Sequence, residues 1–247
     1  MRRRLFIATS LSALAGCGVG NKLNDAATSS GFKNVLESAE ALNHLVIGTR
    51  GRAKLYAPGD VDRDFRTNGF DTPSDATYRG IVADGYSSYR LVVDGEAERK
   101  QAFTLAELRA MQSLTQITRH DCVEGWSAIG EWGGVPLHEL LAVVRPTPRA
   151  RYVIFHSMDR SPDGDPYYES LDMHEAAHPQ TLLALDLNGR PLDPDHGAPV
   201  RLRVPTQLGY KSAKWVNRIQ LAASFAGIGD GKGGYWEDQG YEWYAGI

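Results

Sequence analysis

After residue 44, the hydrophobic positions fall into short runs that glycine, proline and aspartate separate. Runs of this length, rich in β-branched and aromatic residues, are typical of strands. We predict strands at residues 89–93, 152–155, 182–187, 200–204 and 215–221. The last two alternate hydrophobic and polar positions, so both are expected to be half buried. Asn188 and Gly189 follow one of these runs directly and predict a tight turn.

Local signals predict two helices. Thr104 and Glu107 have the spacing of a capping box, which begins a helix that continues to Met111. Pro136 is expected at the first position of a second helix, over residues 137–144. Hydrophobic residues recur there at helical spacing, namely Leu137, Leu140, Leu141 and Val144. Together these elements predict a single α+β domain of mixed β-sheets with short helices over residues 45–247.

The amino-terminal segment has the layout of an export signal. Three arginines precede a hydrophobic run over residues 5–14, which is too short to cross a bilayer, and Cys17 follows. Residues 14–17 resemble a bacterial lipobox, and residues 3–7 resemble a twin-arginine signal. We expect a signal peptide over residues 1–16 and a polar, lipid-anchored tether over residues 17–44. A general secretory signal with a chance cysteine is the alternative.

The chain has two cysteines, so acylation of Cys17 would leave Cys122 without a disulfide partner. Basic neighbours such as Arg119 and His120 are expected to lower the pKa of the Cys122 thiol and to favour the thiolate that binds metal. One cysteine cannot hold zinc or an iron–sulfur cluster alone, because those sites need several protein ligands. A metal that brings most of its own ligands fits Cys122 better.

A second candidate site lies farther along the chain and favours anions. Arg201 and Lys214 supply positive charge, and residues 209–214 offer backbone N–H groups and the Ser212 hydroxyl. Fixed charge combined with such donors is the arrangement that binds a phosphate group.

Five motifs, in order, resemble the molybdopterin-binding domain of the sulfite oxidase family. They occupy residues 122–126, 132–141, 188–192, 196–201 and 209–215. The resemblance extends from about residue 65 to about residue 221, which is most of the predicted domain, and implies the family's molybdopterin-binding fold. It is strongest toward the exported branch that includes the molybdenum subunit of the periplasmic methionine sulfoxide reductase.

The resemblance implies a cofactor, molybdopterin with molybdenum, and a set of residues that bind it. Cys122 takes the place of the thiolate that binds the metal in this family. The other implied residues are Asn68 and Ser157 at the pterin, His196 and Arg201 beside it, and Ser212, Ala213 and Lys214 at its phosphate. His196 departs from the reductase, in which an asparagine occupies this position, so the local hydrogen bonding is expected to differ.

The resemblance also implies the reaction, a two-electron transfer of an oxygen atom. We expect reduction of an S-oxide or N-oxide such as methionine sulfoxide, and sulfite dehydrogenation is the alternative. The sequence has no Cys-x-x-Cys-His haem motif, so a membrane cytochrome b or a soluble cytochrome c is expected to exchange electrons with it. The expected location is the periplasm, at a membrane. A net charge of −3 does not favour nucleic acid as a partner.

Two alternatives come from other functional classes. His174, Glu175 and His178 match the H-E-x-x-H pattern of zinc hydrolases. That chemistry needs both histidines on one helix face, whereas Pro179 follows directly and disfavours helical backbone at His178. A lipoprotein that keeps the fold as a binding module without a cofactor is the other alternative.

Overall fold

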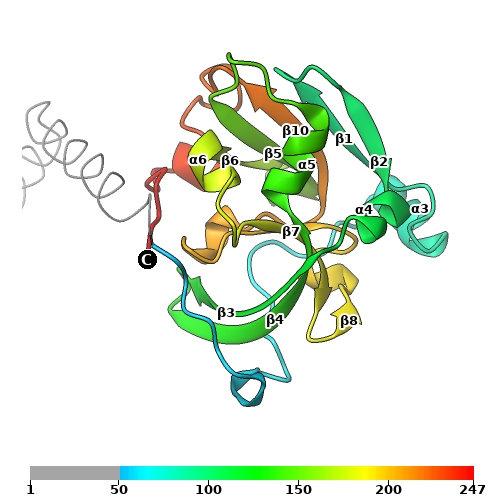
Figure 1. Cartoon of the computed structure of the whole chain (residues 1–247), viewed down its shortest axis with the longest axis vertical. Coiled ribbons are helices and arrows are strands. Elements are labelled where there is room, and N and C mark those ends of the chain that lie inside the picture. The colour runs from blue at the N-terminus through cyan, green and yellow to red at the C-terminus, as the bar shows by residue number, and fades with distance from the viewer. Residues whose placement is uncertain (1–50) are drawn as a thin grey trace, which may run out of the picture. The chain divides into compact units, whose positions relative to one another are not determined.

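The computed structural model describes residues 51–247, which form two β-sheets with short helices (Figure 1). The predicted signal peptide, tether and acylated Cys17 lie outside these residues. The first sheet has the strand order β2-β1-β10-β5-β6. Its strands are β1 (Arg90–Gly95), β2 (Gln101–Thr104), β5 (Tyr152–Arg160), β6 (Pro166–Asp172) and β10 (Val216–Ala222). Only the β1–β10 pair among these is parallel.

The second sheet has the strand order β3-β4-β7-β8, and β9 pairs with β7 on a separate branch. Its strands are β3 (Leu114–Cys122), β4 (Trp126–Pro136), β7 (Leu182–Leu187), β8 (Arg190–Pro191) and β9 (Arg201–Arg203). The predicted tight turn joins β7 to β8. Asn188 and Gly189 have φ values of 53° and 72°, as a two-residue hairpin turn requires.

Helices connect and cover the sheets. The α-helices are α3 (Ala76–Ala83), α4 (Leu105–Ala110), α5 (Leu137–Val144), α6 (Met173–Ala176) and α7 (Tyr235–Asp238), and the 3-10 helices are η2 (Pro58–Asp60), η3 (Pro194–His196) and η4 (Gly209–Lys211). The predicted capping box is confirmed at α4, because the Thr104 hydroxyl accepts from the Glu107 N–H and the Glu107 carboxylate accepts from the Thr104 N–H. Pro136 precedes α5 as its N-cap, so its predicted place inside the helix is wrong by one residue.

The larger hydrophobic core lies between α5 and the first sheet. All four hydrophobic residues predicted on α5 are buried, and they share one cluster with residues of β1, β5 and β10. A smaller cluster surrounds Trp132 on β4 and includes Leu182 and Ala184 from β7. Burial of these apolar side chains is the main favourable contribution to folding.

The predicted strand over residues 200–204 exists as β9, but the prediction that it is half buried is wrong. Arg201 and Arg203 are both 0% exposed. Their guanidinium carbons lie 5.2 and 5.5 Å from the centre of the Trp132 ring, so both charges face the interior. Alternation of apolar and basic residues predicts solvent exposure only where the basic residues have no internal acceptor.

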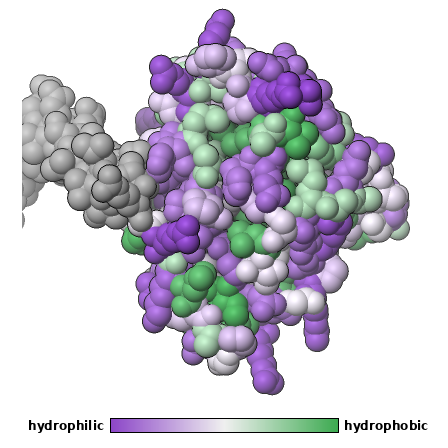
Figure 2. Space-filling view, viewed as in Figure 1, coloured by the Kyte–Doolittle hydropathy of each residue, from purple (hydrophilic) through white to green (hydrophobic). Residues whose placement is uncertain are grey.

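The visible face carries separate hydrophobic patches with hydrophilic residues between them (Figure 2). Within residues 51–247, no helix is both long and apolar enough to span a bilayer.

The core assignment predicts the effect of shortening one side chain of α5. Leu140 is fully buried, so Leu140→Ala should lower the free energy of unfolding by about 2–5 kcal/mol. Val143, on the same helix, is exposed, and Val143→Ala is the matched control, with an expected change within about 0.5 kcal/mol. Urea unfolding of the full chain measures both. Equal effects of the two substitutions would contradict this assignment.

Candidate functional site

A cavity of about 120 Å³ lies among segments of both sheets. Cys122, at the end of β3, lines it together with residues from the β3–β4 turn, β5, β6 and α7. Five of the predicted site residues line this one cavity: Asn68, Cys122, Ser212, Ala213 and Lys214. Asn68, Cys122 and the segment 212–214 are far apart in the sequence, and the fold brings their side chains to one cavity.

Cys122 is positioned by the tight turn between β3 and β4. The Gly125 N–H donates to the Cys122 carbonyl oxygen and closes this turn. Gly125 has a φ of 86°, a backbone angle that glycine adopts without strain. The thiol is buried and forms no disulfide. This arrangement leaves the sulfur at the cavity as an unmodified thiol.

The predicted electrostatic activation of Cys122 is wrong for the protein without cofactor. Burial raises the pKa of Cys122, and the charges that oppose this are Arg201 and Arg66. Arg119 instead pairs with Asp121 at 2.8 Å. Burial beside the two β9 arginines lowers the pKa of His120 well below its usual value, so the imidazole is neutral and does not stabilise a thiolate.

Lys214, in the loop after η4, has no carboxylate partner among the described residues. Its Nζ donates to the carbonyl oxygens of Phe70 at 2.9 Å and Asp195 at 3.2 Å. Burial and the nearby Arg201 lower the pKa of Lys214 to about 7. An anion beside this ammonium would favour its charged form. The Ser212 hydroxyl lies in the same loop and accepts from the Val204 N–H.

The η4 loop approaches β3 closely at Gly209. A Cβ atom at this position would collide with the imidazole of His120, so a side chain does not fit. His120 is fully buried, and neither of its ring nitrogens has a hydrogen-bond partner within residues 51–247. The loop therefore lies against the strand that ends in Cys122.

Arg201 is a buried cation without an anion. Its guanidinium donates to the Asn68 side-chain oxygen at 2.9 Å and to the His196 carbonyl at 3.3 Å, while its Nε has no partner. No carboxylate in the described part of the chain forms an ion pair with it. An uncompensated buried charge is costly, so this position favours an anionic ligand.

The imidazole of His196 does not line the Cys122 cavity and contacts Asp193 and Phe65 instead. Its Nδ1 lies 2.8 Å from Asp193 Oδ1, and its Nε2 lies 2.8 Å from the Phe65 carbonyl oxygen. The side chain lines an outer groove with Asp193 and Arg190, and only the backbone carbonyl of His196 contacts Arg201.

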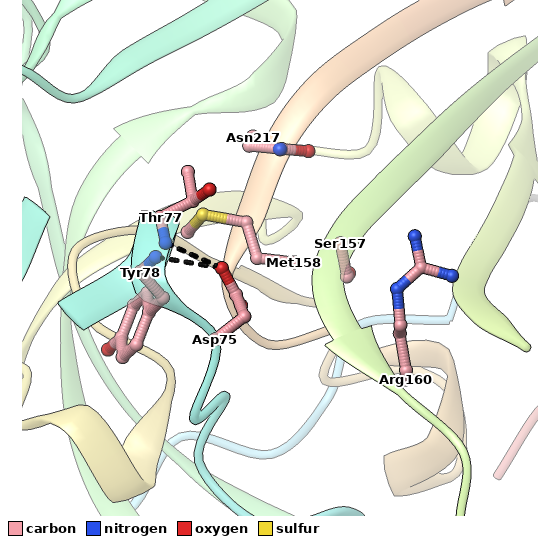
Figure 3. Close-up of a pocket in the computed structure, with 7 residues that line it drawn as sticks. All are labelled: Asp75, Thr77, Tyr78, Ser157, Met158, Arg160 and Asn217. Carbon is pink, nitrogen blue, oxygen red and sulfur yellow. Dashed lines mark hydrogen bonds between the residues drawn. The ribbon is translucent and has the colours of Figure 1, made fainter. Parts of the chain in front are cut away.

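Ser157 lines a different cavity, which Figure 3 shows. Arg160 lies on the same side, and the start of α3 lies opposite, where Asp75 accepts from the N–H groups of Thr77 and Tyr78 at 2.8 and 3.2 Å. The buried Ser157 hydroxyl has no hydrogen-bond partner among the residues of the structure.

A third cavity adjoins both of these. It shares Gly69 and Phe70 with the Cys122 cavity, and it shares Asp75, Met158 and Arg160 with the Ser157 cavity. The predicted pterin and phosphate residues therefore border a series of adjoining cavities along residues 68–75.

Several residues of the Cys122 cavity carry no signal in the sequence. Phe70, Asp159, Tyr167, Trp236 and Tyr241 all line it. Asp159 belongs to a run rich in aspartate, serine and proline, which is typical of a loop, and the aromatic residues lie in no recognisable motif. Only tertiary structure brings these side chains to Cys122.

The H-E-x-x-H segment does not form a zinc site. Helix α6 contains only four residues, Met173–Ala176, and His178 lies beyond its end. The Glu175 carboxylate accepts from the Gln207 side chain at 3.1 Å, and His178 Nε2 lies 3.2 Å from the Gly51 carbonyl. Over residues 51–247, no group of three or more His, Cys, Asp or Glu residues is arranged to hold a metal ion.

Known proteins resemble this chain over most of its length. A putative protein-methionine-sulfoxide reductase subunit YedZ1 of Azospira oryzae is 37% identical over an alignment of 249 positions, which covers 99% of this chain and 87% of that protein. The catalytic subunit MsrP of the protein-methionine-sulfoxide reductase is 41% identical in Xanthomonas campestris and 35% identical in Campylobacter jejuni, each over 145 residues. Those two matches cover 55% and 54% of this chain, and 45% and 49% of the MsrP chains.

A structural match and a family match support the same assignment as these relatives. The crystal structure of the sulfane dehydrogenase SoxCD from Paracoccus pantotrophus matches with a TM-score of 0.51 and 26% identity, over 56% of this chain and 39% of that chain. Residues 79–226 match the oxidoreductase molybdopterin binding domain family. The predicted fold and family are confirmed: the chain belongs to this family, the sulfite oxidase family, and is a molybdopterin-dependent oxidoreductase whose cofactor contains molybdenum.

Proposed function

We propose that this chain is the catalytic subunit of an exported reductase that removes the oxygen atom from sulfoxides, with methionine sulfoxide as the substrate. The observation that carries the proposal is the single cysteine thiol in a cavity whose buried Lys214 and adjacent Arg201 lack anionic partners. The names of the relatives, protein-methionine-sulfoxide reductase subunits, support the choice of substrate.

The described residues fit the cofactor in two respects. Cys122 offers the one soft ligand that a metal already held by a dithiolene requires. Arg201 and Lys214 offer positive charge that no carboxylate of the described chain compensates in an ion pair, which suits a phosphate group. When bound, the cofactor supplies two-electron oxygen-atom transfer.

We assign the residues of the chain to the parts of this cofactor. Cys122 is the metal ligand, and its proton leaves when it binds, since metal binding requires the thiolate. Asn68 and Ser157 face the pterin, and His196 and Arg201 flank it. The phosphate is held by the loop residues Ser212, Ala213 and Lys214.

The lining of the cavity favours a neutral substrate over sulfite. Aromatic and aliphatic side chains surround the thiol, namely Phe70, Val123, Tyr167, Tyr210, Trp236 and Tyr241. The Glu124 carboxyl group also lines it and would repel a sulfite anion when ionised, while the positive charge of Lys214 is assigned to the phosphate of the cofactor. A sulfoxide has an apolar body and one polar oxygen, so both features admit it. Reduction is therefore favoured over sulfite dehydrogenation.

The proposed location is the periplasm, with a lipid anchor on Cys17. The lipobox-like and twin-arginine-like segments support this, because a protein that folds around its cofactor before export needs such a route. Electrons would come from a separate protein, a membrane cytochrome b or a soluble cytochrome c, because the sequence has no haem-attachment motif of its own.

The reaction itself is tested with protein made in cells that synthesise molybdopterin. Reduced viologen should be oxidised when methionine sulfoxide is added, and methionine should form in proportion. Sulfite should reduce cytochrome c slowly or not at all. Rapid cytochrome reduction by sulfite, without any sulfoxide reduction, would contradict the proposed direction.

If Cys122 binds the metal, replacing its sulfur atom by oxygen should release the molybdenum. Cys122→Ser should remove molybdenum and abolish turnover, because a neutral hydroxyl is a poor ligand for a soft site. Metal analysis of the purified protein measures this. Cys17→Ser is the matched control and should retain its molybdenum. Full molybdenum content in Cys122→Ser, together with a molybdenum X-ray absorption spectrum that shows no loss of a sulfur ligand, would rule out Cys122 as the ligand.

The anchor predicts a change of fraction when Cys17 is removed. Wild-type protein should sediment with membranes and carry labelled fatty acid, whereas Cys17→Ser should remain unlabelled and be recovered in the soluble fraction. Cys122→Ser, which keeps the lipobox, should sediment like the wild type. Equal labelling of Cys17→Ser and wild type would refute the anchor.

A further inference from the structure

Asp159 is a buried carboxyl group beside the residues assigned to the cofactor. It lies next to the end of β5, lines the cavity that contains Cys122, and is 4% exposed. Its Oδ1 is buried and has no hydrogen-bond partner within residues 51–247. An unpaired buried carboxyl oxygen is unfavourable, so it calls for an explanation.

A local irregularity in the first sheet gives Asp159 its position. The β5–β6 pairing is regular up to His156 and resumes only at Arg160, with a register shift between them. Such irregularities redirect side chains, and they recur next to active sites. Asp159 lies inside the shifted stretch and thereby lines the cavity.

The groups around Asp159 come from several elements. Lys214, from the loop after η4, exerts the main opposing charge, and Tyr167 approaches from β6. Cys122 and Glu124, from the β3–β4 turn, line the same cavity. Burial outweighs the attraction of Lys214 and raises the pKa of Asp159 to about 7, so a large share of this carboxyl keeps its proton at neutral pH.

Glu124, the other carboxyl group that lines the cavity, is exposed to solvent, whereas Asp159 is buried. The two oxygens of Glu124 accept from the Gly69 N–H at 3.4 Å and the Trp126 indole N–H at 3.0 Å. Both carboxyl oxygens of Glu124 therefore already accept hydrogen bonds from the protein. Asp159, in contrast, keeps a buried oxygen without a partner beside the cavity, where it can hydrogen-bond to a substrate.

We propose that Asp159 is the proton donor to the oxygen atom that leaves the sulfoxide, an inference that rests on the proposed function. In the net reaction, the sulfur–oxygen bond breaks, the sulfur is reduced by two electrons, and the oxygen leaves as water with two protons. Asp159 supplies one proton and solvent supplies the other. Two molecules of a one-electron donor, reduced viologen in the assay, supply the electrons. Lys214 stabilises the resulting carboxylate, which then takes a proton from solvent.

The test compares Asp159→Asn, Asp159→Glu and wild type in the viologen assay across pH. The wild-type rate should fall as pH rises through about 7, because Asp159 loses its proton. Asp159→Asn should lower kcat by about 10²–10⁴-fold with little change in KM and should lose this pH dependence. Asp159→Glu should restore part of both. Asp163→Asn, an exposed position in the β5–β6 loop, should behave like the wild type.

A second measurement does not depend on turnover. Infrared difference spectra of the wild-type protein should show the C=O stretch of a protonated carboxyl group that disappears as pH rises through neutrality. The band should be absent in Asp159→Asn and present in Asp163→Asn. Its absence from the wild type would overturn the proposal.

The outcomes separate this inference from the proposed function. A wild-type enzyme that reduces no sulfoxide refutes the proposed function itself. An active wild type together with an Asp159→Asn variant of equal kcat and pH profile refutes only the proton donor. Loss of molybdenum or pterin from Asp159→Asn would make Asp159 a cofactor-binding residue and would also overturn the proposal. Wild-type cofactor content with a low, pH-independent kcat supports it.

Discussion

Positive charge buried without a matching carboxylate is the constraint on which this site depends. Arg201 and Arg203 lie on one short strand, fully buried against Trp132. Burial and the nearby Arg201 together lower the pKa of Lys214. Transfer of a charge from water to a protein interior costs several kcal/mol unless a partner compensates it. In the described chain, the hydrogen bonds of Arg201 end on neutral oxygens. An anionic cofactor that binds here would stabilise the folded protein in proportion to its affinity.

Lys211, three residues before Lys214, is a buried lysine that does have carboxylate partners. Lys211 is as deeply buried as the arginines, but its Nζ contacts Glu169 at 2.5 Å and Glu237 at 2.6 Å. These contacts connect β6, η4 and α7, and α7 contributes Trp236 to the cavity. Two carboxyl groups share one ammonium, and burial raises the pKa of Glu169 well above its usual value. Internal ion pairing thus fixes the wall of the cavity, while the unpaired Lys214 remains available for a ligand.

Sequence alone predicted the elements that short-range interactions determine. The capping box of α4 and the hairpin turn at Asn188 depend on contacts a few residues apart, and both are confirmed. The long strands β3, β4 and β6 were not predicted, because polar residues interrupt their hydrophobic pattern and pairing with distant strands fixes them. The environment of Cys122 was mispredicted for a similar reason. Sequence neighbours pointed to Arg119, whereas burial raises the pKa of the thiol, and the positive charges that oppose this rise are Arg201 and Arg66.

Family motifs extended the prediction further than physical patterns could. They pointed to Cys122 and to residues 212–214, which the structure brings to one cavity, but Asp159 has no motif and was found only from its burial beside that cavity. The central claim is that Cys122 is the sole protein ligand of molybdenum in this cavity. Crystals of the cofactor-loaded protein, measured at the molybdenum absorption edge, test it directly. One anomalous peak per chain is expected, at bonding distance from Cys122 Sγ; a peak bound to other side chains, or no molybdenum peak, would contradict the claim.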